Sequence, residues 1–284
     1  MEIPFRLAAG CFIFAFALLH EASANLVLDP DFTGVTYSGT TGGLTTLYGQ
    51  FGTETGSTLT VADWSTSGYN FVYAPGTGDI GTNTAGANSG NPKEAPGQYN
   101  YNGYGTTYMW GPNNGSANGL PSTNPAGGNF IAMDGAYEVG AVSQTITGLT
   151  VGKVYALKFY WAAAQQQSFT GATTENITAT LGSQSFTTTT YDLTSEGFSG
   201  WMQQTFDFTA TSTSETLSFL AAGTPSGEPP FTLLGGVDLE LVPDTSNWMG
   251  FAGFGAACIV FQGARRRYRR KAQLAQSEQL PPVA

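Results

Sequence analysis

The most informative feature of this sequence is what its central part lacks. Between Asn25 and Val242 there is no cysteine, no histidine and no arginine. The two cysteines are Cys11 and Cys258, and the single histidine is His20. The central part therefore cannot form a disulfide, a Ser-His-Asp triad, a cysteine nucleophile or a zinc site of the usual His/Cys kind. Its chemistry is limited to carboxylates, hydroxyls, amides, aromatic rings and three lysines.

Positive charge is also scarce there. Residues 25–242 carry Lys93, Lys153 and Lys158 against 16 acidic residues, a net charge of −13. Such a surface repels nucleic acid and anionic lipid. We therefore expect no nucleic-acid partner. Of the six arginines, one is Arg6 and the other five lie between residues 265 and 270.

The N-terminus has the layout of a secretory signal peptide. Arg6 precedes an uncharged apolar run over residues 7–19, and Ala22-Ser23-Ala24 follows as an A-x-A cleavage site. The 13-residue run is short for a bilayer span. The pattern predicts a signal helix within residues 1–24, cleavage after Ala24 and export of the remainder.

The C-terminus reads as a membrane anchor with a stop-transfer signal. Residues 248–264 carry no charge and are just long enough for a single transmembrane helix. A basic cluster follows directly, which fixes a helix end on the cytoplasmic side. Its members are Arg265, Arg266, Arg267, Arg269, Arg270 and Lys271, and residues 272–284 form a polar tail. Phosphate binding by this cluster is the weaker alternative, because the cluster abuts an apolar segment.

Residues 242–271, beginning "VPDTSNW", resemble the PEP-CTERM sorting signal. That signal has a Val-Pro-Glu-Pro-type motif and a nearby Trp, then an apolar helix, then an arginine cluster. Val242, Pro243, Ser246 and Trp248 match its spacing, with Asp244 in place of the family's Glu. The resemblance implies recognition by an exosortase, a membrane transpeptidase-like enzyme, and cleavage near residues 243–244. Before processing, the C-terminal helix would hold the chain transiently in the inner membrane. The expected final location is the cell envelope, the outer surface or the extracellular space.

Residues 25–241 are predicted to form one all-β domain, an antiparallel β-sandwich of the jelly-roll type. Apolar residues alternate with polar ones over 155–161, 177–181, 202–208, 217–221 and 237–241, and turn-forming residues separate these runs. Many short strands with one polar face are typical of a sandwich. Long runs of helical period do not occur.

Residues 86–128 are rich in Gly, Asn, Tyr and Pro and are predicted to be a long loop. Aromatic rings bind the CH faces of sugars, while amides and carboxylates bind their hydroxyls. The candidate sugar contacts are Tyr99, Tyr101, Tyr104, Tyr108 and Trp110 in the loop, with Tyr137 beyond it. The alternative is that the tyrosines only anchor the loop.

The run from Gly127 to Ala163 resembles galactose-binding-like and carbohydrate-binding-module jelly rolls. The matching elements are "GNFIAMDG" at 128–135, "SQTI" at 143–146 and "GKVYALKF" at 152–159. The resemblance implies sugar binding and, in several members, a structural Ca²⁺ between the first and last strands. Asp29, Asp31 and Asp238 are the candidate ligands, since Ca²⁺ prefers oxygen; the alternative is that they are solvated strand ends. No other cofactor is expected.

Three functions follow from these features. The first is a non-catalytic carbohydrate-binding module acting on exopolysaccharide. The second is a structural or adhesive biofilm matrix protein without a discrete sugar site. The third is a glycoside hydrolase that uses two carboxylates such as Asp134 and Glu138. We favour the first and predict that the protein is not an enzyme, because nothing in the sequence sets two carboxylates at a useful separation.

Overall fold

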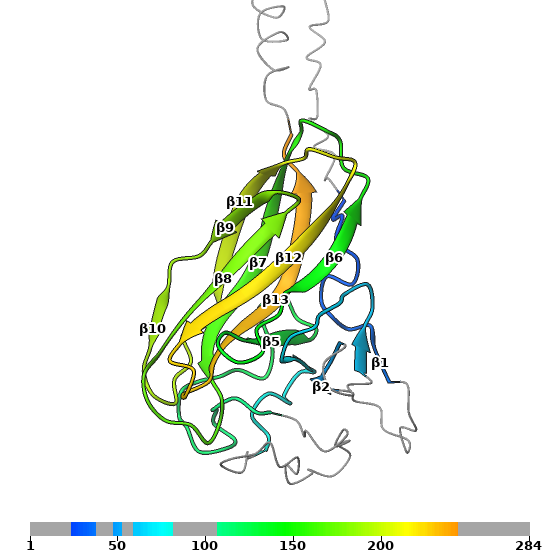
Figure 1. Ribbon diagram of the computed structural model, residues 1–284. Coiled ribbons are helices and arrows are strands. Elements are labelled where there is room, and N and C mark those ends of the chain that lie inside the picture. Colours follow the sequence, from blue (N-terminus) through cyan, green and yellow to red (C-terminus); the bar gives the residue numbers. More distant parts are fainter. Residues whose placement is uncertain (1–23, 38–47, 53–58, 82–106, 244–284) are drawn as a thin grey trace, which may run out of the picture. The chain divides into compact units, whose positions relative to one another are not determined.

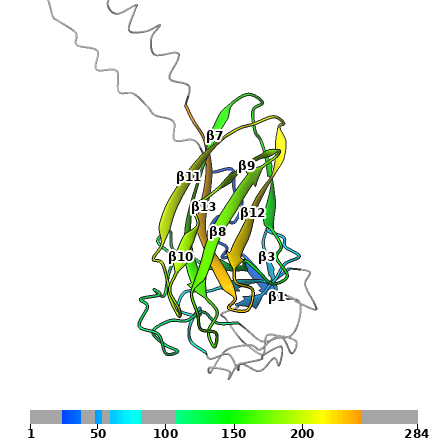
Figure 2. The same cartoon turned by 60° about the vertical axis from the view of Figure 1, so that its left-hand side comes forward.

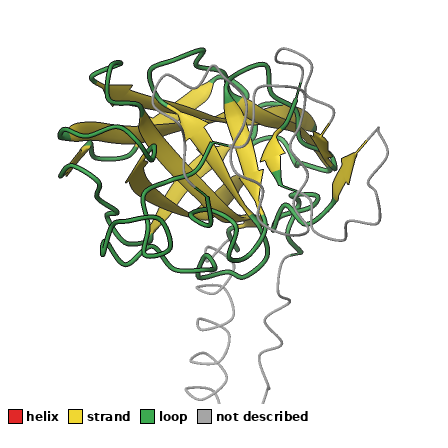
Figure 3. Cartoon of the chain, turned by 90° about the horizontal axis from the view of Figure 1, so that it is seen from below, coloured by secondary structure: helices red, strands yellow, loops and turns green. Residues whose placement is uncertain are grey.

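The computed structural model describes residues 24–37, 48–52, 59–81 and 107–243. The described residues form strands and loops without a helix (Figure 3), which confirms the all-β prediction. No helix in these ranges could cross a membrane. The predicted signal helix, transmembrane helix and arginine cluster lie outside the described residues. The chain divides into two units, residues 1–241 and 242–284, and the described strands all belong to the first.

Two antiparallel sheets stack face to face (Figures 1 and 2). The five-stranded sheet contains, in spatial order, β10 (Tyr191–Leu193), β8 (Thr173–Leu181), β12 (Ser214–Thr224) and β6 (Val142–Thr147), with β9 (Gln184–Thr187) also paired to β8. The six-stranded sheet contains β11 (Met202–Thr209), β7 (Val154–Gln165), β13 (Pro230–Leu241), β5 (Phe130–Asp134), β4 (Asn70–Tyr73) and β2 (Gly49–Gln50). A separate pair joins β1 (Val35–Tyr37) to β3 (Leu59–Val61).

The space between the two sheets holds the main hydrophobic core. Every apolar face predicted from the period-two pattern points into it, including Tyr155, Leu157, Phe159 and Trp161 of β7, none more than 3% exposed. The pattern works because successive side chains of a strand point to opposite sides of the sheet. Burying these faces in a common layer is what holds the two sheets together.

A second hydrophobic cluster covers part of the opposite face of the six-stranded sheet. It is formed by Tyr48, Phe71, Tyr73, Tyr108, Met109, Leu120, Phe130, Ala132, Ala162, Ala164, Phe231 and Leu233. Residues 70–73 and 130–134 are buried throughout, so β4 and β5 are covered on both faces. The covering layer is the described end of the long loop, where Asn114 donates to the Met109 carbonyl at 2.7 Å and Asn118 to the Trp110 carbonyl at 2.8 Å.

A β-bulge in β13 separates the covered part of this face from the open part. Gly235 pairs with Tyr160 and Asp238 with Lys158, so β13 has one extra residue between these two pairs. The extra residue reverses the alternation. Phe231 and Leu233 therefore face the second cluster, while after the bulge it is Asp238 and Glu240 that point to the same side.

Candidate functional site

The structure describes three of the six predicted sugar contacts. Tyr99, Tyr101 and Tyr104 lie outside the described residues. Tyr108 is 1% exposed and packs in the second cluster, so the prediction of a sugar contact is wrong for this residue: its ring has no free face. Trp110 is partly buried, and its indole N–H donates to the Phe169 carbonyl at 2.7 Å. Tyr137 is exposed and lies edge-on to Tyr69, with ring centroids 5.6 Å apart.

Two of the three predicted calcium ligands, Asp29 and Asp31, accept hydrogen bonds from neighbouring groups. Both carboxylate oxygens of Asp29 accept the Gly34 N–H, at 3.1 and 3.2 Å, and burial raises the pKa of Asp29, a rise to which the charge of Asp31 adds. Asp31 Oδ1 accepts the Thr33 hydroxyl at 2.8 Å. Within the described ranges, no group of three or more His, Cys, Asp or Glu residues is placed to hold a metal ion. Calcium held by fewer carboxylates remains a prediction.

Asp134 and Glu138, the carboxylates of the hydrolase alternative, lie in and after β5. Asp134 Oδ1 accepts the N–H groups of Ala136 and Tyr137 at 2.8 and 2.9 Å, which fixes the turn after the strand. Burial raises the pKa of Asp134 to about 6. The Asp134 carboxylate is buried and is used by this turn, whereas Glu138 is exposed.

Only the start of the sorting motif is described. Val242 is 39% exposed and Pro243 is exposed. Asp244, Ser246, Trp248 and the basic cluster lie outside the described residues, so the sorting motif remains a prediction.

Beyond the bulge, the second cluster ends and the six-stranded sheet presents an open polar face. We call this the polar face; its side chains are Lys158, Tyr160, Gln203, Thr205, Asp207, Asp238 and Glu240, on β7, β11 and β13. Their direction follows from the register, because residues that alternate with them, including Phe159, Phe206 and Leu239, belong to the main core or pack against it.

A hollow of about 290 Å³ lies where the polar face meets the covering loop, and we call it the Asp238 hollow. Its floor is β7 and β13, and its rim includes Asp31 and Ala126. Glycine makes this junction possible. Gly236 has φ +55°, and a Cβ at this position would lie 2.2 Å from the Cβ of Ala126.

The side chains of the Asp238 hollow combine a ring, an amide and carboxylates. Tyr160 is partly exposed, and the Gln203 amide donates to its hydroxyl at 3.4 Å. Asp238 Oδ1 is buried and has no hydrogen-bond partner. Burial raises the pKa of Asp238, as does Glu240, while Lys158 opposes the rise. A buried acceptor without a partner is costly and favours a ligand that donates a hydrogen bond.

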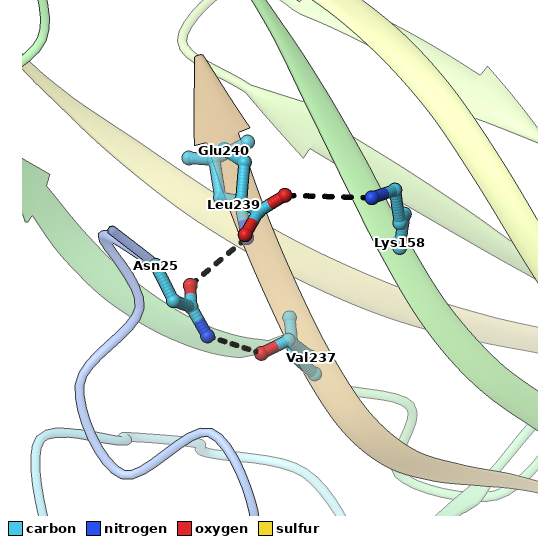
Figure 4. Close-up of polar contacts among 5 residues, drawn as sticks. All are labelled: Asn25, Lys158, Val237, Leu239 and Glu240. Atoms are coloured by element: carbon cyan, nitrogen blue, oxygen red, sulfur yellow. Dashed lines mark hydrogen bonds and ion pairs between the residues drawn. The ribbon is translucent and has the colours of Figure 1, made fainter. Parts of the chain in front are cut away.

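The N-terminal segment fixes the strand that carries Asp238 (Figure 4). Asn25 Nδ2 donates to the Val237 carbonyl at 3.1 Å, and the Leu239 N–H donates to Asn25 Oδ1 at 2.9 Å. On the other side, Lys158 Nζ lies 3.4 Å from Glu240 Oε2. Asp238 is thus held between two fixed neighbours on a rigid strand.

Reasoning from sequence missed Lys158, Tyr160 and Gln203 as site residues. The signal was present, because Lys158 and Tyr160 occupy the outward positions of a strand whose inward face the period-two pattern predicts.

No protein-family model and no curated protein matches this chain. Among solved structures it is similar to the carbohydrate-binding module TmCBM61 in complex with β-1,4-galactotriose, at 13% identity over 78% of this chain and 100% of that one, with a TM-score of 0.35. It is similar to the CBM22-1 xylan-binding domain of Paenibacillus barcinonensis Xyn10C, at 9% identity over 70% and 95%, with a TM-score of 0.31. It is also similar to the N-terminal cellulose-binding domain of Cellulomonas fimi β-1,4-glucanase C, at 20% identity over 41% and 79%, with a TM-score of 0.26. Because these TM-scores are low, function rests on the chain's own residues.

Proposed function

We propose that this protein is a non-catalytic carbohydrate-binding module that takes a sugar residue of a polysaccharide in the Asp238 hollow. One observation carries the proposal: the partly buried Asp238 carboxylate, whose Oδ1 has no hydrogen-bond partner, lines one hollow with the Tyr160 ring and the Gln203 amide. A sugar hydroxyl can donate to the Asp238 carboxylate, the amide can bind a second hydroxyl, and the ring can take a CH face of the sugar.

The hollow suits one sugar residue within a longer chain. The polar face continues from it along Thr205 and Asp207 of β11, so neighbouring residues of an extended polymer would meet more hydroxyl and carboxylate groups. The excess of acid over base in residues 25–242 favours a neutral polymer over an acidic one.

We further propose that the protein is exported and acts on exopolysaccharide at the cell envelope or outside the cell. The A-x-A site, the apolar segment at 248–264 and the basic cluster after it support this proposal, with an exosortase as the sorting partner. A structural biofilm protein without a sugar site is the alternative, and it would share the same route.

The test is affinity electrophoresis of the purified protein in gels containing β-1,4-galactan, xylan, hydroxyethyl cellulose or alginate. We expect at least one neutral polymer to retard the protein and alginate to leave it unretarded. Tyr160→Ala should weaken binding about tenfold, because a stacked ring contributes about 0.5–1.5 kcal/mol beyond its buried area. Tyr160→Phe should retain most of the affinity.

Gln203 and Gln204 provide a matched pair, because adjacent residues of β11 point to opposite sides of the sheet. Gln203→Ala should weaken retardation, and Gln204→Ala should not. Equal affinity of all four variants and the wild type would place any sugar site elsewhere. Absence of retardation by every polymer would favour the matrix alternative, and release of reducing ends from a polymer would favour the hydrolase.

A further inference from the structure

The outward side of the five-stranded sheet has a composition that the proposed site does not explain. We call the outward side chains of β6, β8, β9 and β12 the hydroxyl face. Apart from Asn176, Leu220 and Ala222, every one of them is Ser or Thr. The two carboxylates in these strands, Glu175 and Glu215, occupy inward positions and are buried. The outward side chains of these four strands therefore carry no charge, and the exposed Asp192 lies beyond them on β10, at the edge of the sheet.

Hydrogen bonds between neighbouring hydroxyl groups hold side chains of this face in place. Thr178 and Thr187 are paired Oγ1 to Oγ1 at 2.8 Å, and Thr180 and Ser185 at 2.8 Å. Such a pair uses one donor and one acceptor, and each hydroxyl has one donor and two acceptors. Each pair thus keeps one donor and several acceptors for a ligand, in fixed positions, so that little side-chain entropy is lost on binding.

A hollow opens at the β6 edge of this face. It has a volume of about 380 Å³, within the usual range for a ligand site, and is lined by Leu28, Asp63, Ser65, Ser143, Thr145 and Thr216, with Gln144 behind them. We call it the Asp63 hollow. Ser65 extends the sheet here, because its backbone exchanges two 2.9 Å hydrogen bonds with Ser143. The hollow is therefore continuous with the ranks of hydroxyls on β6 and β12.

The side chains of the Asp63 hollow and of the hydroxyl face favour one class of ligand. The hydroxyls and the Asp63 carboxylate bind a partner that is itself rich in hydroxyls, and the exposed side chain of Leu220 offers an apolar contact for CH groups. A face without positive charge on an acidic protein does not attract a polyanion. Strands lie about 4.8 Å apart, and outward residues repeat about every 6.7 Å along each strand. That regular array suits an extended chain that lies across several strands.

We propose that the Asp63 hollow and the adjoining hydroxyl face form a second binding surface for a neutral, extended polysaccharide, on the opposite side of the sandwich from the Asp238 hollow. One molecule then binds two polymer chains and cross-links them. The cross-linking, but not the second surface, rests on the proposed function.

The test uses the full chain carrying Tyr160→Ala, so that the first site is weakened, and adds Thr145→Ala together with Thr216→Ala. Affinity electrophoresis in xylan and in hydroxyethyl cellulose measures binding. The threonine pair should weaken the remaining retardation about tenfold or more, since two hydrogen bonds of about 1 kcal/mol each are lost. Thr170→Ala, an exposed threonine in the loop between β7 and β8 and on neither face, should leave the remaining retardation unchanged.

Cross-linking is read from the light scattering of dilute hydroxyethyl cellulose or xylan on addition of protein. The wild type should raise the scattering, whereas Tyr160→Ala alone and the threonine pair alone should each bind and fail to raise it. Unchanged affinity of the threonine pair in the Tyr160→Ala background overturns the second surface and leaves the first intact. The second surface is also overturned if the wild type self-associates without polymer and the two threonine substitutions abolish this. The hydroxyl face would then be a contact between copies of the protein.

Discussion

The buried carboxyl of Glu175 makes the stability of this protein depend on pH. Glu175 lies on the inward side of β8 with no exposed surface. Its Oε1 accepts the Thr173 hydroxyl, and its Oε2 has no hydrogen-bond partner. Burial raises the pKa of this carboxyl from 4.5 to about 8, and the Asp192 carboxylate adds to the rise.

The sign of the effect follows from the two pKa values. A carboxyl whose pKa is higher in the folded state binds a proton more tightly there, so its contribution to stability is present below about pH 4.5 and is lost as pH rises to about 8. Each pKa unit corresponds to about 1.4 kcal/mol, so the free energy of unfolding should fall by on the order of 5 kcal/mol across this window. Glu175→Gln removes the titration and should abolish that part of the fall.

Urea unfolding of the wild type and Glu175→Gln at pH 5, 7 and 9 tests this reasoning. The two proteins should be similar at pH 5, and the variant should be the more stable by several kcal/mol at pH 9. Asp207→Asn, which removes an exposed carboxylate, is the control and should follow the wild type. Parallel pH profiles for the wild type and Glu175→Gln would show that Glu175 is not held neutral and would refute this reasoning.

Three further substitutions test the fold around the Asp238 hollow. Gly236→Ala should lower the free energy of unfolding by about 1–3 kcal/mol, since it forces a left-handed residue against Ala126; thermal unfolding measures this, and an unchanged Tm would contradict it. Asn25→Ala removes two hydrogen bonds to β13 and should lower the free energy of unfolding, measured in urea, by about 1–3 kcal/mol. An unchanged urea midpoint would contradict this. Phe231→Ala should cost about 3–5 kcal/mol if the second cluster is a true core, and a cost below about 1 kcal/mol would show that it is not.

The fold was predictable where strands have one buried face. The odd-numbered residues of 155–161 and 237–241 point into the core as their period predicts. The short strands β2 and β4 gave no such signal, because β4 is buried on both faces and β2 has only two residues. The second cluster was equally hidden, since its covering layer comes from a loop whose Gly/Asn/Tyr composition shows no period.

The site was less predictable than the fold, for a reason that lies in β13. The bulge at Gly235 and Gly236 turns Asp238 toward the polar face, and a single extra residue of this kind leaves only a Gly-Gly pair as its mark in the sequence. The loop aromatic residues attracted attention by composition, yet the ring of Tyr108 fills the second cluster. Tyr160 and Gln203 meet only through strand pairing between β7 and β11, which are distant in sequence.

The most direct test of sugar binding in the Asp238 hollow is to map where a sugar binds. ¹⁵N-labelled protein would be titrated with β-1,4-galactotriose, xylohexaose and cellohexaose while amide chemical shifts are recorded. We predict saturable shifts at the Gln203 side-chain amide and at the backbone amides of Gly236 and Asp238, reduced in Tyr160→Ala. Saturable shifts elsewhere in the chain, with these amides unmoved, would contradict a site in this hollow.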